Sequence, residues 1–100
     1  MYIAMNRFKI IPGREQDFEA IWRNRDTNLE KVPGFLKFHL VKGAREKTHT
    51  EYASHSTWNS HQDFKNWTTS EAFRESHKGA GEHKNIYLGH PVFEGFEVIL

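Results

Sequence analysis

Three residues of this chain have side chains that suit chemistry in an apolar pocket: Asn6, Trp67 and His77. His77 closes a predicted short helix directly before the glycine-bearing stretch 78–81. A neutral imidazole there suits heme iron as an axial ligand, and the glycines would let a wide planar ligand approach the backbone. Because cationic side chains also favour helix C-termini, a structural role is the simpler explanation of His77 taken alone.

Asn6 and Trp67 also have two explanations each. Asn6 lies between Ala4 and Phe8 on the apolar side of a predicted strand, where a buried amide usually hydrogen-bonds to neighbouring groups. Its NH₂ group would equally suit a hydrogen bond to an oxygen ligand of a bound metal, since an amide does not titrate. Trp67 lies on the apolar stripe of a predicted helix, which ordinarily indicates core packing. Together with Phe73 and His77 it could line one wall of a pocket.

The other histidines show no paired spacing of the HxxxH or HExxH kind that indicates a metal site. We interpret them as exposed or hydrogen-bonded structural residues; they are His39, His49, His55, His61, His83 and His90.

Composition excludes several classes of protein. The 14 basic residues nearly balance the 13 acidic ones, and no basic block indicates nucleic-acid binding. The chain has no cysteine, which excludes disulfides, zinc ribbons and thiolate nucleophiles. It shows neither a secretory leader nor an apolar run long enough to span a membrane. We therefore expect a cytoplasmic protein that binds neither nucleic acid nor membranes.

The elements that must position the three residues follow from hydrophobic periodicity. Residues 3–11 read as a strand ended by a Pro-Gly turn, and residues 14–29 as a helix. Strands are predicted at 35–42, 50–58 and 93–100, with Leu36, Phe38 and Leu40 on one face of the second strand. Ser60 and Ser70 are placed to cap two helices, the second ending at His77, and residues 78–91 read as a loop.

This order is βαββαβ, which predicts an α+β, ferredoxin-like domain over residues 1–100 with a four-stranded antiparallel sheet. Its helices are long enough to cover only one face of such a sheet. Two sheets placed face to face would cover the other, so we expect a homodimer that forms an α+β barrel.

Three segments together resemble the IsdG-type heme-degrading monooxygenases, within the antibiotic-biosynthesis-type monooxygenase superfamily. They are MNRFKIIPG at 5–13, VPGF at 32–35 and WNSHQDFKNWTTSEAFRESH at 58–77. The W-x-x-S-E-A-F-x-x-x-H pattern within the last segment is the most specific. The likeness spans essentially the full length and is greatest to proteobacterial members that form biliverdin-type products.

The resemblance implies that heme is both the substrate and the cofactor that activates O₂, with electrons from an external donor such as a reductase or a small reductant. His77 would bind the heme iron, Asn6 would hydrogen-bond to the distal ligand, and Trp67 would press the porphyrin out of planarity. The product would be a biliverdin-type open tetrapyrrole, with release of iron. Three phenylalanines could pack on the ring, and three polar side chains could meet the propionates: Phe8, Phe64 and Phe73, and Arg25, Lys78 and His83.

Two alternatives stay open at this stage. One is a cofactor-independent monooxygenase of the same fold that oxidises an aromatic or quinol substrate. The other is a dimeric protein without catalytic activity, which either binds heme without turnover or binds nothing.

Overall fold

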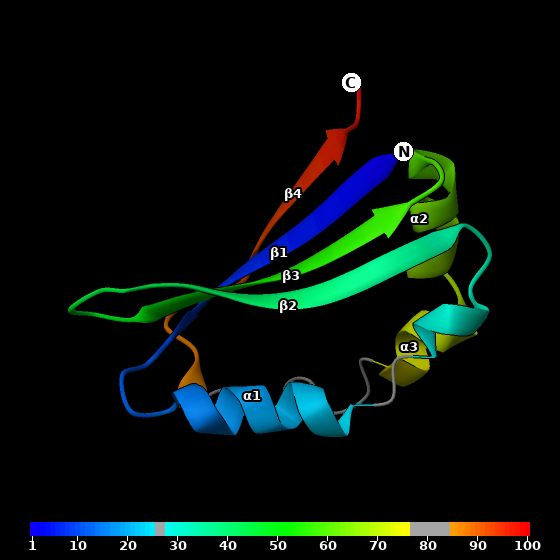
Figure 1. The fold of residues 1–100 in the computed structure, drawn as a ribbon. Coiled ribbons are helices and arrows are strands. Elements are labelled where there is room, and N and C mark those ends of the chain that lie inside the picture. The colour runs from blue at the N-terminus through cyan, green and yellow to red at the C-terminus, as the bar shows by residue number, and fades with distance from the viewer. Residues whose placement is uncertain (26–27, 77–84) are drawn as a thin grey trace.

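A computed structural model of the chain describes residues 1–25, 28–76 and 85–100. Its four strands form one antiparallel sheet in the order β2-β3-β1-β4. Three helices and a short 3₁₀ turn complete the βαββαβ order, with the helices against one side of the sheet (Figure 1). The predicted ferredoxin-like arrangement is thereby confirmed. The strands are β1 (Tyr2–Ile10), β2 (Phe35–Arg45), β3 (Thr50–Trp58) and β4 (Val92–Glu97), and the helices are α1 (Glu15–Asn24), α2 (His61–Thr68) and α3 (Glu71–Ser76).

The alternation of β1 decides which side of the sheet carries the helices. Tyr2, Ala4, Phe8 and Ile10 are buried, whereas the intervening basic side chains of β1 remain exposed. A period of two puts the buried residues on one face, and Asn6 belongs to that face by the same alternation.

Two apolar clusters form on this face, one toward each end of the sheet. Phe18 of α1 packs with Phe8, Ile10 and Tyr52 at the end where β2 and β3 are joined. At the other end, Phe64 and Trp67 of α2 pack against a cluster of Tyr2, Ala4, Leu29 and Trp58. Figure 1 shows α1 and α2 at these opposite ends. The core is thus divided along the length of β1, and Asn6 lies between its two parts.

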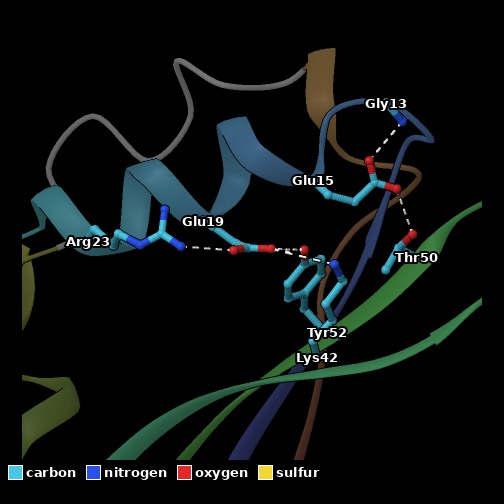
Figure 2. A network of polar contacts seen from close by, with 7 residues as sticks. All are labelled: Gly13, Glu15, Glu19, Arg23, Lys42, Thr50 and Tyr52. Atoms are coloured by element: carbon cyan, nitrogen blue, oxygen red, sulfur yellow. Dashed lines mark hydrogen bonds and ion pairs between the residues drawn. The ribbon is translucent and has the colours of Figure 1, made fainter.

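Two carboxylates fasten α1 to β3 (Figure 2). The Thr50 hydroxyl donates to Glu15 over 2.8 Å, and the Tyr52 hydroxyl donates to Glu19 over 2.5 Å. These hydrogen bonds hold the pKa of each carboxyl below its ordinary value. Burial, together with the bond to Glu19, raises the pKa of Tyr52. The orientation of α1, and of the Trp22 side chain that it carries, therefore depends on a polar network as well as on packing.

Serine caps position the other two helices, as the sequence predicts. The Ser60 hydroxyl accepts a hydrogen bond from the Asp63 backbone N–H over 3.1 Å at the start of α2. Ser70 accepts one from the Phe73 N–H over 3.2 Å and donates to the Trp67 carbonyl over 2.6 Å. The second serine thus links the end of α2 to the start of α3 and fixes the angle between Trp67 and Phe73.

Five sequence predictions need correction. The first helix ends at Asn24 rather than at Leu29, because the backbone is extended at Arg25, and Leu29 is buried from a separate 3₁₀ turn at Leu29–Lys31. Leu36 does not share a face with Phe38 and Leu40, since a bulge between Phe35 and Lys37 leaves it 44% exposed.

The second strand continues three residues beyond Lys42, and the last strand begins at Val92 and ends at Glu97. The predicted loop contributes a buried core residue, Ile86, while the neighbouring Tyr87 forms a bridge with Ile10.

Within the described ranges, no helix has the length and apolar character needed to cross a membrane.

Candidate functional site

A row of directly opposed residues crosses all four strands at the level of Asn6. Asn6 pairs with Ser54 of β3 and Phe93 of β4, and Ser54 pairs with Leu40 of β2. Directly opposed residues of antiparallel strands point to the same face. The row therefore lies on the helix-facing side of the sheet, and Asn6 occupies a strand that has a neighbour on each side.

The Asn6 side chain is half-buried and makes no hydrogen bond to any other described residue. A half-buried amide without a protein partner can hydrogen-bond to water or to a ligand. Its neighbours along the strand, Ala4 and Phe8, belong to the two different apolar clusters. The amide thus lies where the two clusters meet and is available to a ligand between them.

A wall of aromatic side chains, formed by Phe64, Trp67 and Phe73, lies on one side of Asn6. Trp67 packs edge-on against Phe73, with ring centroids 4.8 Å apart. It also contacts Trp58, with centroids 5.3 Å apart and an angle of 32° between the rings. Phe64 lies 6.1 Å from Trp67 and stacks on Phe93 at 5.5 Å with an angle of 5° between the rings. Since Phe93 is the register partner of Asn6, the wall reaches the row that contains the amide.

A groove lies on the side of α1 and β2. Trp22 stacks on Phe38 at 5.6 Å, and the Arg25 guanidinium lies 4.4 Å from the centre of the indole. Burial lowers the pKa of Arg25, and the Trp22 Nε1 is buried without a hydrogen-bond partner among the described residues. The groove encloses about 450 Å³ and is lined by Glu19, Trp22, Arg23, Arg25, Phe38, Leu40, Lys42 and Tyr52. Leu40 also belongs to the Asn6 row, so the groove opens beside it.

The structure brings some of the predicted site residues together and separates others. Phe64, Trp67 and Phe73 form one wall, with Asn6 next to it through Phe93. Phe8 lies in the other cluster, in ring contact with Phe18, Trp22 and Tyr87. Three predicted residues lie outside the described residues: His77, Lys78 and His83.

The site contains three further side chains that were not predicted from the sequence: Trp22, Phe38 and Phe93. Trp22 and Phe38 are visible in the sequence only as members of apolar stripes. Phe93 could have been found from the pairing of β1 with β4, because that register places it opposite Asn6. The resulting arrangement suits a flat, largely apolar ligand with an anionic edge, since it combines aromatic walls, a non-titrating amide donor and a cationic groove.

Comparison with known proteins gives a consistent result. The model of the antibiotic biosynthesis monooxygenase family matches residues 1–79. A heme-degrading monooxygenase of Shouchella clausii is 36% identical over 72 residues, covering 71% of this chain and 67% of that protein. One of Halalkalibacterium halodurans is 34% identical over 77 residues, covering 77% and 66%. These alignments therefore span about two thirds of the relatives' length.

Solved structures share the fold. The heme degrader MhuD of Mycobacterium tuberculosis, determined with two hemes in its active site, superposes with a TM-score of 0.76 at 26% identity, covering 100% of this chain and 97% of that chain. SnoaB of Streptomyces nogalater, a cofactor-independent oxygenase, superposes with a TM-score of 0.70 at 19% identity, covering 99% and 93%. The second likeness concerns the fold alone.

Proposed function

This chain belongs to the antibiotic biosynthesis monooxygenase family, and from that premise we propose that it is an oxidoreductase that degrades heme. It would bind heme between the aromatic wall and the groove and open the macrocycle with O₂ and electrons. The product would be a biliverdin-type open tetrapyrrole, with release of iron. The observation that carries the proposal is the amide of Asn6, which lies between the wall and the groove and makes no hydrogen bond to another described residue.

The residues present fit heme in shape and in charge. A porphyrin is flat and apolar, and the described wall offers it the faces and edges of Trp67, Phe73 and Phe64. Its two propionates are anionic, and Arg25 provides a guanidinium held in place by its contact with Trp22. A partly desolvated arginine binds a carboxylate strongly and with defined geometry. Arg25 is therefore the propionate partner that we propose among the described residues.

Each of the three central residues has a distinct role in this proposal. Bound heme supplies the iron at which O₂ is activated, with electrons from an external reductase or small reductant. His77 would hold the iron, an assignment supported by the resemblance of segment 58–77 to heme-degrading monooxygenases. Asn6 would donate a hydrogen bond on the O₂-binding side without titrating. Trp67, fixed by Phe73 and Trp58, would act as a rigid wedge against the ring.

The helix-free face of the sheet supports the proposed homodimer of single-domain chains. Val41, Val92 and Phe96 are 43%, 55% and 45% exposed, and their strand positions put them on this face. Covering them with a second sheet would remove apolar surface from water at roughly 25 cal/mol per Å². Dimerisation would thus cover the apolar side chains that the fold leaves exposed on this face of the sheet.

The proposal is tested by titrating the chain with hemin under anaerobic conditions, then admitting air and a reductant. We expect a Soret band that saturates at about one heme per chain, followed by Soret decay and chelatable iron. A stable Soret band after air and reductant would indicate heme binding without turnover. Failure to bind hemin would favour a cofactor-independent oxygenase.

The role of His77 is tested in the same titration. His77→Ala should lose the ferric heme spectrum of the wild type, because it removes the proposed axial ligand. His90→Ala, which changes an exposed histidine of the described chain, serves as the matched control and should keep that spectrum. An unchanged ferric spectrum in His77→Ala would rule out the ligand assignment.

A further inference from the structure

The helix-free face of the sheet carries two histidines at its centre. The register places His39 of β2 opposite His55 of β3, and His55 opposite Met5 of β1, which is opposite Glu94 of β4. The two imidazole rings lie 6.5 Å apart. His39 is exposed, and His55 is half-buried, with its Nδ1 atom buried and without a hydrogen-bond partner among the described residues.

Apolar and small side chains surround this pair. Val41 and Ala53 form the neighbouring pair on one side, and Thr57 pairs with Ile3 on the other. Ala53 and Thr57 are already buried between larger neighbours, whereas Val41 is 43% exposed. Any partner that covers the apolar part of this face must therefore also cover the two imidazoles.

The charges on the face are nearly balanced when the imidazoles are neutral. Three cations and two carboxylates give a net charge of +1: Arg7 and Lys9 from β1, Lys37 from β2, Glu51 from β3 and Glu94 from β4. Arg7 and Glu94 pair at 3.1 Å. Protonation of both histidines would raise the net charge of the face to +3. Two such faces brought together would then repel each other, and the buried imidazolium groups would be left without partners.

In the homodimer of the proposed function a second copy of the chain covers this face, and we propose that His39 and His55 make that association sensitive to protons. The proposal rests on the homodimer of the proposed function and extends it to regulation. A second copy fits because the neutral face offers both signs of charge beside exposed apolar side chains, so that two identical faces can pair around a two-fold axis.

The direction of the effect follows from where protons bind. Histidine changes charge between about pH 5 and 8. A proton on either imidazole adds positive charge to a face that already carries a net charge of +1, and an identical copy would bring the same charge against it. Protons therefore bind preferentially to the separated chains. The dimer is stable at neutral pH and weakens as the pH falls.

The test is the dimer dissociation constant of the heme-free chain, measured by analytical ultracentrifugation at about pH 7.5 and about pH 5.5 in buffers of equal ionic strength. We expect the constant to rise at least about tenfold at the lower pH. The variant carrying both His39→Gln and His55→Gln should stay dimeric with nearly the same constant at both pH values. His61→Gln, on the helix-bearing side, serves as the matched control and should behave as the wild type does.

Each outcome has a separate meaning. A wild-type chain that is monomeric at both pH values would overturn the interface. A dimer with equal constants at both pH values, or a pH dependence that persists in the double variant, would overturn the histidine switch. His39→Gln alone changes an exposed side chain and should reduce the pH dependence, which keeps the test valid if the double variant does not fold. Because the chain is free of heme, failure of the proposed heme chemistry would not change these results.

Discussion

The functional proposal depends most on the side chain of Asn6. It lies on β1 between two apolar clusters and makes no hydrogen bond to another described residue. A strand position between buried apolar residues is usually occupied by an apolar side chain. The Asn6 side chain is therefore better explained as a binding group than as a core residue.

For Asn6, we expect Asn6→Ala to bind hemin with nearly wild-type affinity but to degrade it at least about tenfold more slowly, as is found when a single stabilising donor is removed. Hemin titration and the rate of Soret decay measure the two effects. Asn59→Ala, an exposed asparagine in the turn after β3, is the matched control. Loss of hemin binding, or of folding by circular dichroism, would instead assign Asn6 a structural role.

Trp67, unlike Asn6, is held in place by neighbouring aromatic rings on two sides. Trp67→Phe keeps an aromatic ring but shortens the wedge, so we expect hemin binding to persist and turnover to fall about tenfold or more. Resonance Raman spectra of the anaerobic complex should show weaker out-of-plane porphyrin modes than the wild type does. Undiminished turnover together with unchanged Raman modes would show that Trp67 serves only in packing.

At the scale of elements, α1 is held by hydrogen bonds that cross from helix to strand. Tyr52 is almost fully buried, and its hydroxyl reaches Glu19 from the neighbouring layer. Arg23 and Lys42 approach the same carboxylate at 3.0 Å and 3.8 Å (Figure 2). The network lies beside the groove, so that the placement of Trp22 and Arg25 depends on it.

We predict that Tyr52→Phe lowers the free energy of unfolding by about 1 kcal/mol near neutral pH. The hydrogen bond lowers the pKa of Glu19 below its ordinary value of 4.5. Its contribution is therefore complete above that value and is lost as the pH falls through the lower pKa of the folded state. Urea denaturation between neutral and acidic pH should show the gap between variant and wild type closing as the pH drops.

Tyr87→Phe is the control, because the Tyr87 hydroxyl makes no hydrogen bond within the described part of the chain. It should show no such pH-dependent gap. A gap of constant size across the pH range in Tyr52→Phe would mean that the hydroxyl contributes through packing rather than through Glu19.

Local chemistry explains which elements could be predicted. The caps at Ser60 and Ser70 and the alternation of β1 depend on residues close in sequence, and the structure shows all three. The bulge at Leu36 and the burial of Ile86 depend on how distant strands and the core fit together. No short-range pattern encodes such fits, so periodicity alone placed Leu36 on the wrong face.

At the scale of the whole molecule, the βαββαβ order places the described helices against one side of the sheet and leaves the other side without them (Figure 1). The site could be predicted from the sequence only where its residues lie close together along the chain. Trp67 and Phe73 lie close in sequence, and their spacing indicated a shared wall, to which the structure adds Phe64. The contributions of Phe93 and Phe38 require the strand register and the approach of α1 to β2, which only the folded chain specifies.

The most direct test of the central claim is the iron released when the hemin-loaded chain is given air and a reductant in the presence of catalase and a ferrous chelator. Catalase removes free peroxide, so that bleaching of heme by peroxide in solution does not contribute. Heme degradation predicts about one chelated iron for each heme lost from the Soret band. A Soret band that persists, or that decays without chelated iron once catalase is present, would contradict the proposed function.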